Sequence, residues 1–222
     1  MYLLNVKHNI SSLITGIERP SANRKTGPMT QVWHIRNDMH PLEAARTGAD
    51  EAICGNCSLR GIAGKKRTCY VTLAQAPTAI YHGLERAKPL KIHLLHNRDI
   101  RWGAYGDTAL AVEAALVADV NKRARGWTGY THQWKSCDQE FSRFLMASCD
   151  SEADYHAAKE AGWRTFRVKR PGDPVLSTER VCPASAEAGN RLTCIQCQLC
   201  NGTSSRKKDI VIDAHGMGAK YL

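Results

Sequence analysis

The sequence lacks the short motifs that mark several large classes of enzyme. Its 222 residues include no Walker A loop, no G-x-S-x-G elbow and no H-E-x-x-H zinc motif. The turn from Gly103 to Gly106 does not complete a dinucleotide-binding fingerprint. These absences leave a kinase, a serine hydrolase, a zincin and a dehydrogenase without support from any motif.

Long apolar runs and a secretory leader are missing as well. No apolar stretch approaches the roughly 20 residues that a membrane span needs. The first residues have neither the charged start nor the apolar middle of a secretory signal. We therefore expect no membrane partner and a cytoplasmic location, where thiols stay reduced. Hydrophobic residues make up 43% of the chain, which is typical of a globular protein.

Cysteine is abundant, and its count of nine argues against a complete disulfide framework because the number is odd. Seven of the nine fall into two clusters with the spacing of metal ligands. Site one consists of Cys54, Cys57 and Cys69, and site two of Cys182, Cys194, Cys197 and Cys200. Thiolates are soft ligands that suit both zinc and iron–sulfur clusters. The pattern predicts two metal sites without deciding which metal each one holds.

The two sites differ in the number of thiols that they offer. A tetrahedral zinc at site one would need a fourth ligand, such as His40, His82, Cys137 or Cys149. A four-iron cluster on three cysteines would instead leave one iron open to a substrate or cofactor. The alternative is a structural zinc ion that only orders a long loop. Site two has four cysteines and predicts a closed structural zinc or a second, auxiliary cluster.

Hydrophobic patterning predicts strands alternating with helices after an N-terminal arm and loop at 1–28. The expected strands are 31–35, 100–105, 127–132, 144–149, 165–168 and 210–213. The expected helices are 73–87, 108–122, 138–142 and 151–161, and the segment 36–68 is expected to be turn-rich. Such alternation indicates parallel β/α units. We predict an α/β fold, a partial (β/α)6 barrel of mostly parallel strands, as one domain over 29–222 with cysteine-rich insertions at 50–70 and 180–203.

Polar residues follow the predicted strands, where β/α folds gather their ligands. The candidates for cofactor binding are Gly103, Tyr105, Gly106, Asp107, His132, Ser148, Asp150, Asp213 and His215. The histidines could act as acid–base groups or ligands, or could simply hydrogen-bond at a strand end. The aspartates could hold a ribose or an amino group, or could cap a helix, for which Asp107 is well placed.

The formal net charge of +10 makes contact with a polyanion plausible. The basic residues gather in 65–67, 164–170 and 206–208. The alternative is a solvated basic surface that offsets the charge of metal-bound thiolates. A nucleic acid or a nucleotide is therefore the expected partner or substrate, whereas the oligomeric state is not indicated.

The order of strand, three-cysteine loop, helix and glycine-rich strand end resembles the radical SAM superfamily over about residues 30–216. The resemblance implies a four-iron cluster on Cys54, Cys57 and Cys69 whose fourth iron binds S-adenosylmethionine. It also implies that Gly103, Tyr105, Gly106 and Asp107 lie at the methionine-binding position, and that 149–151 offers polar cofactor contacts. The spacing here is C-x2-C-x11-C, where the family usually has C-x3-C-x2-C.

The Cys69-Tyr70 pair and the late C-x2-C-x2-C run also resemble small phage-encoded cysteine-rich proteins, which implies a location in the host cytoplasm. The leading hypothesis is a radical-SAM-like oxidoreductase or transferase that modifies a nucleic acid, a nucleotide or a related anion. One alternative is a non-catalytic zinc protein that binds nucleic acid or a host protein. The other is a metal-dependent hydrolase or transferase that uses His132, His215 and Asp213.

Overall fold

The computed structural model describes residues 1–61, 66–204, 208–216 and 218–219. The strands are β1 (Tyr2–Lys7), β2 (Ile10–Thr15), β3 (Thr30–Arg36), β4 (Lys88–Pro89), β5 (Asp99–Tyr105), β6 (Gly126–Thr128), β7 (Tyr130–Thr131), β8 (Met146–Cys149), β9 (Thr165–Lys169), β10 (Glu179–Val181) and β11 (Asp209–Asp213). The α-helices are α1 (Pro41–Thr47), α2 (Glu51–Cys54), α3 (Ala76–Tyr81), α4 (Thr108–Ala111), α5 (Ala114–Arg123), α6 (Glu152–Glu160) and α7 (Cys194–Cys197). Short 3-10 turns are η1 (Ser58–Arg60), η2 (Leu84–Arg86), η3 (Ile92–Leu95), η4 (Gln133–Lys135), η5 (Gln139–Arg143) and η6 (Gly202–Ser204).

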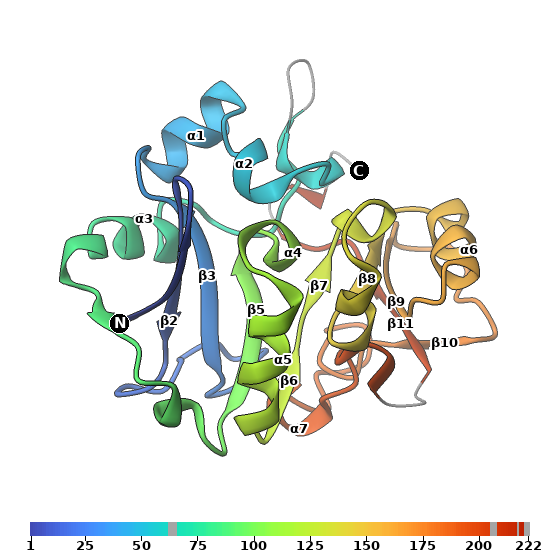
Figure 1. Ribbon diagram of the computed structural model, residues 1–222. Coiled ribbons are helices and arrows are strands. Elements are labelled where there is room, and N and C mark those ends of the chain that lie inside the picture. The colour runs from blue at the N-terminus through green and yellow to red at the C-terminus, as the bar shows by residue number, and fades with distance from the viewer. Residues whose placement is uncertain (62–65, 205–207, 217, 220–222) are drawn as a thin grey trace.

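The strands form two sheets, which Figure 1 shows side by side. A six-stranded sheet has the order β4-β1-β2-β3-β5-β6, and a five-stranded sheet has the order β10-β11-β9-β8-β7. Most neighbouring strands are parallel, and the antiparallel pairs are β1 with β2 and β2 with β3. The expected α/β class with mostly parallel strands is confirmed. The strands belong to two sheets, however, and form no closed barrel in the described part of the chain.

The two sheets meet at Gly129, the single residue between β6 and β7. The strands β3, β5, β6–β7, β8, β9 and β11 thus follow one another in chain order, each parallel to its neighbour. Gly129 lies tightly against both sheets: a Cβ atom there would come within 2.9 Å of the Trp102 Cβ and 2.5 Å of a Leu145 methyl. A side chain larger than hydrogen would therefore push the sheets apart at their junction.

The first fifteen residues, expected to belong to an arm, form a β-hairpin instead. Lys7 pairs with Ile10 across a turn in which His8 has a positive φ of 53°. The hairpin then adds to β3, so that Leu13 and Ile14 are fully buried. Residues 2–15 thus belong to the first sheet, and β2 pairs both with β1 across the short turn and with β3, which lies farther along the chain.

Two expected helices are interrupted. The helix expected at 108–122 is divided into α4 and α5 by extended residues Val112 and Glu113. The hairpin explains the break, since Asn5 Nδ2 donates to the freed Ala111 carbonyl at 3.3 Å and Lys7 pairs with Glu113 at 2.9 Å. The helix expected at 73–87 consists of α3 and the turn η2, with Pro77 in its first turn as predicted.

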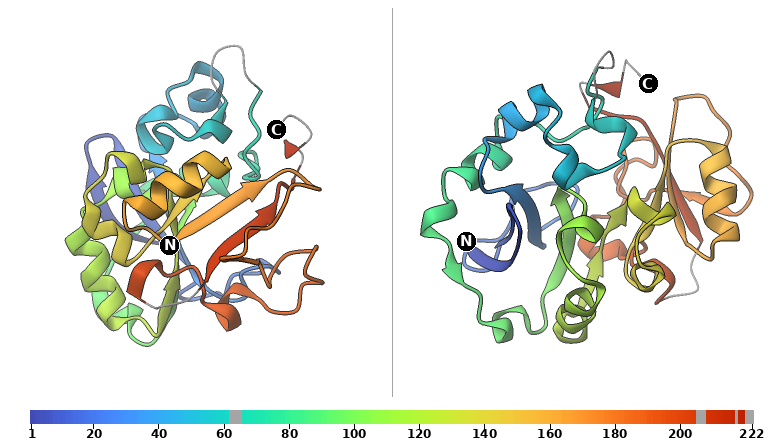
Figure 2. Two further views of the ribbon diagram at one scale, coloured as in Figure 1. Left: turned by 90° about the vertical axis from the view of Figure 1, so that its right-hand side faces the viewer. Right: turned by 45° about the horizontal axis from the view of Figure 1, so that its top comes forward.

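The segment 36–68, expected to be turns, contains α1, α2 and η1. In Figure 1 these helices lie at the top of the molecule, whereas α7 lies at the bottom, beyond the opposite ends of the strands. Figure 2 shows that α6 packs outside the second sheet. Among the described residues, no helix is both long and apolar enough to pass through a membrane.

Ser151 is confirmed as the N-cap of α6, because its hydroxyl accepts the Asp154 amide at 3.0 Å. Asp154 does not complete a capping box, since its carboxylate pairs with Lys135 at 2.6 Å. We expect Ser151→Ala to lower the free energy of unfolding by about 1 kcal/mol, measured in urea, because an orphan helix amide loses its acceptor. Ser151→Gly is the matched control, and we expect it to lower the free energy of unfolding by only about 0.3 kcal/mol. Equal losses in the two variants would contradict the capping role.

Candidate functional site

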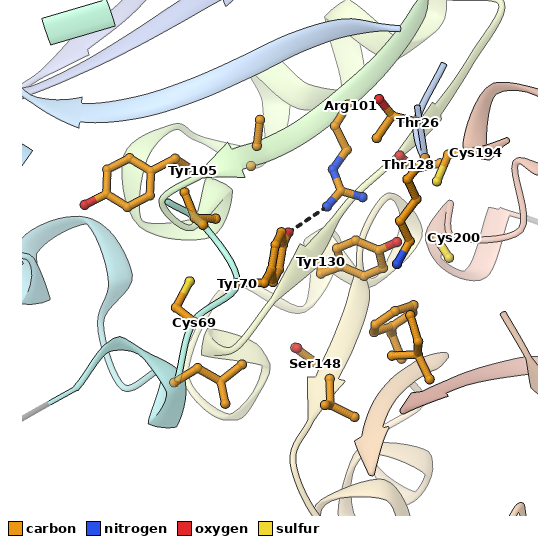
Figure 3. A pocket seen from close by; sticks show the side chains of 18 of the residues that line it. Thr26, Cys69, Tyr70, Arg101, Tyr105, Thr128, Tyr130, Ser148, Cys194 and Cys200 are labelled. Carbon is orange, nitrogen blue, oxygen red and sulfur yellow. Dashed lines mark hydrogen bonds between the residues drawn. The ribbon is translucent and has the colours of Figure 1, made fainter. Parts of the chain in front are cut away.

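One cavity of about 420 Å³ lies between the sheets and the two cysteine segments (Figure 3). Its walls come from alternate residues of the parallel strands: Gln31 and Trp33, Arg101, Gly103 and Tyr105, Thr128, Tyr130 and His132, Ser148, Phe166 and Val168, Ile210, Ile212 and Ala214. The residues between them, such as Ile100, Trp102, Ala147 and Cys149, are buried in the hydrophobic core. One face of each strand thus packs in the core, and the other faces the cavity, so neither face is on the outer surface, as is usual for parallel strands. The alternation gives one face to the core and the other to the cavity.

All seven cysteines of sites one and two line this cavity. Site one lies over the carboxyl ends of the strands, where the Asp107 amide donates to the Ile53 carbonyl at 2.6 Å. Site two lies near the amino ends, where Gln198 Nε2 donates to Asp99 at the start of β5. Figure 3 shows Cys69 on one side of the cavity and Cys194 and Cys200 on the other. Segments far apart in the sequence therefore converge on one space.

The loop of site one is held by Gln133, which follows β7. Its side-chain amide donates to the Cys54 carbonyl at 3.3 Å and accepts the Asn56 amide at 3.4 Å. Gly55 has a φ of 53°, and a Cβ atom there would lie 2.5 Å from the Gln133 side-chain oxygen. Glycine at this position therefore lets the loop turn and lets Gln133 fix it. Cys69 is tied to the same loop through its amide, which donates to Leu59 at 2.8 Å.

A buried ionic network lies beneath site one. Asp50 is fully buried and pairs with Arg60 at 2.7 Å and with Arg67 at 3.1 Å. Arg60 also donates to the Gly48 carbonyl at 3.0 Å, which ties the start of the loop to its end. The charged groups of Asp50, Arg60 and Arg67 take the place of an apolar core in the loop of site one. They order the backbone that carries its thiols.

Two thiols of site one, those of Cys54 and Cys69, have raised pKa values. Burial raises the pKa of Cys54 well above its usual value, and the charges of Asp50, Cys57 and Cys69 raise it further, while Arg67 opposes them. Burial also raises the pKa of Cys69, again opposed by Arg67. Converting them to thiolates requires an additional positive charge nearby.

His132, Asp150 and Ser58 form a hydrogen-bonded chain beside Cys57. His132 Nε2 lies 3.7 Å from the Cys57 sulfur and 3.4 Å from an Asp150 oxygen, and Ser58 donates to the other Asp150 oxygen at 2.5 Å. Burial by itself would lower the pKa of His132, but its hydrogen bonds to Asp150 and Cys57 raise it well above the ordinary value. The pKa of Asp150 is lowered despite burial, because His132 and Ser58 stabilise its carboxylate. The predicted residues His132 and Asp150 are thus brought together.

Asp107 has a structural role that the sequence allowed for. One carboxylate oxygen accepts the Ala109 amide at 3.0 Å and caps α4, and the other accepts the His132 amide at 2.8 Å. Burial raises its pKa. Asp107 therefore joins the carboxyl ends of β5 and β7 and orients His132.

The glycine-rich turn after β5 is bent by Gly103 and Gly106, whose φ values are 62° and 76°. A Cβ atom on Gly106 would lie 2.7 Å from the His34 Cβ, so the turn packs directly against β3. His34 is buried and hydrogen-bonded to Ser12 at 2.9 Å and Thr108 at 3.0 Å, and burial lowers its pKa to about 3. Tyr105 is buried with a hydroxyl that has no partner among the described residues, and burial raises its pKa.

Site two is built around the single turn of α7. Thr193 and Gln196 form a capping box at its start, and the Cys194 and Ile195 amides donate to the Lys25 and Thr26 carbonyls before β3. Burial raises the pKa of Cys200 to about 12, with a hydrogen bond to Tyr130 opposing the rise and the charges of Cys182, Cys194 and Cys197 adding to it. Burial likewise raises the pKa of Cys182. The four sulfurs therefore lie within electrostatic reach of one another.

Neither set of thiols is closed around a single point. Over the described ranges, no group of three or more His, Cys, Asp or Glu side chains is arranged to hold a metal ion. The fourth ligands considered for site one do not line the cavity. His40 and His82 contact each other and Tyr81 near α1 and α3, with the two histidine ring centroids 5.4 Å apart. Cys149 is buried in the core, and Cys137 lies behind η4.

Of the remaining residues predicted to bind a cofactor, two lie at the cavity and one lies outside it. Ser148 lines the cavity, and His215 lies at its rim, stacked on Tyr70 with ring centroids 5.7 Å apart. Asp213 does not line the cavity, because its carboxylate pairs with Lys169 at 2.5 Å on the other side of β11. Asp213 therefore lies apart from the candidate residues that line the cavity.

The basic segment 164–170 is largely engaged inside the protein rather than displayed as a patch. Arg164 donates to the Gly202 carbonyl at 2.8 Å and the Lys208 carbonyl at 2.6 Å. Arg167 forms a buried ion pair with Glu179 at 2.6 Å. Arg67 is enclosed beneath site one, whereas Lys65, Arg206 and Lys207 lie outside the described residues. Of the described members of these segments, Arg67, Arg164 and Arg167 are thus engaged inside the protein, whereas Lys66, Arg170 and Lys208 are exposed.

Sequence reasoning did not name Arg101, Thr128, Tyr130 or Tyr70 as site residues, although all four line the cavity. Arg101 was visible as a charged residue between the apolar residues Ile100 and Trp102 of a predicted strand. A lone charge at an alternate position of a buried strand indicates a polar interior. Comparison with known proteins adds no family, since no family model, no curated protein and no solved structure matches this chain.

Proposed function

We propose that this chain is an iron–sulfur enzyme of the radical SAM type that acts on a small anionic substrate such as a nucleotide. The observation that carries the proposal is the position of the three-thiol loop. It lies over the carboxyl ends of consecutive parallel strands and lines the same cavity as Gly103, Tyr105, His132 and Ser148. Cofactors of β/α folds bind at that end of the strands.

The strand order supports the fold that this proposal needs. Six parallel stretches in chain order, from β3 to β11, surround one cavity with alternate side chains. An open, partial (β/α)6 barrel has this order and this alternation. The interruption at Gly129 would then be a local break in a single curved wall.

The residues beside site one fit an anionic, acceptor-rich group. Arg67 Nε and Nη2, the Thr68 hydroxyl and the Tyr105 hydroxyl are buried without a hydrogen-bond partner in the described part of the chain. All three residues line the cavity next to the thiols. Buried donors usually have partners, and the sulfides of an iron–sulfur cluster accept such bonds. The thiols of Cys54, Cys57 and Cys69 would close on the metal by side-chain rotation, since metal binding commonly completes the order of its own ligands.

A four-iron cluster held by Cys54, Cys57 and Cys69, once reduced by an external one-electron donor, would supply the electron that cleaves a carbon–sulfur bond of S-adenosylmethionine to methionine and a carbon radical. The chain's own residues would position the reactants. Gly103 and Gly106 bend the turn so that it packs against β3 and still lines the cavity, and Ser148 and His215 would offer polar contacts at the wall and the rim. His132, held by Asp107 and Asp150, would orient Cys57.

Metal analysis of protein purified without oxygen tests this proposal. We expect a brown protein with absorbance near 400 nm and about four irons bound at site one. Cys137→Ser is the matched control, because Cys137 lies outside the cavity and should leave colour and iron unchanged. A colourless protein that holds only zinc would overturn the iron–sulfur enzyme and favour the non-catalytic zinc protein. The hydrolase alternative is less supported, since Asp213 is paired outside the cavity that His132 lines.

A further inference from the structure

Arg101 and Thr128 lie side by side on the cavity wall. They are register partners on the parallel strands β5 and β6, and both line the cavity. Figure 3 shows the Arg101 side chain reaching into this space between Tyr130, Tyr70 and Thr128. Two neighbouring strands therefore present a guanidinium and a hydroxyl to the same place.

Arg101 is 8% exposed, and no carboxylate of the described residues pairs with it. Its neighbours are the Tyr70 hydroxyl, at 3.2 Å from Nη2, and the Tyr130 ring, whose centroid lies 4.6 Å from the guanidinium carbon. Both are neutral groups, which solvate the cation without balancing its charge. An enclosed guanidinium without a counter-charge is costly, so the arrangement is stable only where an anion can approach.

Thr128 provides a second observation, which is independent of the one on Arg101. The side chain is 2% exposed, and its hydroxyl has no hydrogen-bond partner in the ranges that the structure describes. Because Thr128 also lines the cavity, its unpartnered hydroxyl is a candidate to bond a ligand there. It would add a neutral donor beside the charged fork of Arg101.

We infer that Arg101 and Thr128 form a subsite for the oxyanion, carboxylate or phosphate, of a small-molecule ligand. The guanidinium fork matches two oxygens of either group, and the hydroxyl of Thr128 can donate to one of them. The cavity of about 420 Å³ is the size of a small-molecule site, which favours a monomeric ligand over a nucleic-acid strand. The proposed subsite does not depend on which metal binds at site one, because Arg101 and Thr128 are not ligands of that metal.

The competing role for Arg101 is to balance the thiolates of site two. The thiolate charge of Cys194 would stabilise the Arg101 cation, since the two groups lie close enough to interact electrostatically. If that were its role, replacing Arg101 would loosen the metal at site two and leave anion binding unaffected. The two roles therefore make opposite predictions.

Calorimetric titration of the metal-loaded protein with inorganic phosphate and with benzoate tests the inference, and neutral benzamide serves as the uncharged comparison. We expect at least one anion to bind and benzamide not to bind. Arg101→Gln should weaken anion binding about 30-fold or more, and Thr128→Val several-fold. Arg180→Gln is the matched control, an exposed arginine on β10 outside the cavity, and should change nothing.

Metal content is measured on the same samples. Unchanged metal in Arg101→Gln together with weaker anion binding is the expected result. Failure of both anions to bind the wild-type protein, or loss of site-two metal with unaltered anion binding, would overturn the subsite. Should Arg101→Gln fail to fold, Arg101→Lys and the isosteric Thr128→Val carry the test, because both keep the volume of the wall.

Discussion

Replacing Cys57 with serine is expected to abolish metal binding at site one and, with it, any activity of the protein. Cys57 lies between α2 and η1, lines the cavity and contacts His132. A serine hydroxyl does not ionise near neutral pH and is a hard ligand, so it cannot replace a thiolate on iron or zinc. Two remaining thiols are too few for either kind of site. Iron bound to the purified protein should fall by about four atoms per chain.

The measurement is iron, zinc and acid-labile sulfide on oxygen-free samples of three proteins. Cys197→Ser should remove metal from site two and leave site one filled, because the two sites face each other across the cavity without sharing a ligand. Cys137→Ser should retain both metals, because Cys137 does not line the cavity that the other seven thiols share. Full metal content in Cys57→Ser would show that site one does not depend on this thiol.

Replacing Asp50 with alanine is expected to cause the largest loss of stability. The Asp50 carboxylate is fully buried between Arg60 and Arg67, with contacts at 2.7 Å and 3.1 Å. Its removal leaves two enclosed guanidinium groups without their shared counter-charge. Breaking a buried ion pair in this way costs about 3–5 kcal/mol. Urea unfolding of the metal-free protein measures the loss, and metal binding at site one should weaken in parallel, since Arg67 and the loop lose their anchor.

Asp119→Ala is the control for an exposed ion pair. Asp119 pairs with Arg123 one turn along α5, where both side chains are partly exposed. A pair of this kind contributes only about 0.3–0.5 kcal/mol. Similar losses in Asp50→Ala and Asp119→Ala would contradict the view that the buried network orders the loop of site one. If Asp50→Ala does not fold, Asp50→Asn, which keeps hydrogen-bonding capacity to one arginine, provides the measurable intermediate.

Local sequence pattern correctly predicted several elements of the fold. The strand at β5 and the α6 cap come from short-range signals, namely alternation over Ile100–Tyr105 and a hydroxyl before a helical segment. Cysteine spacing likewise identified the seven side chains that now line the cavity. Such signals act over a few residues, so the chain carries them wherever it folds.

Local pattern missed the features that depend on distant partners. The hairpin of β1 and β2 exists because β3 offers an edge, and α4 separates from α5 because Asn5 and Lys7 bind the residues at the break. Asp213 was expected in the cavity but pairs with Lys169 instead. In each case a contact between residues far apart in the chain outweighs local propensity.

Residue spacing was thus sufficient to recognise parallel strands, strand-end polar residues and two groups of clustered thiols, because these follow from periodicity and short loops. It was insufficient to show that both groups of thiols face one cavity with Arg101 and Thr128 between them. That arrangement depends on which side of each strand turns inward and on how two sheets meet at Gly129. Packing of the whole chain decides both, since burial of one strand face is worth more than any local preference.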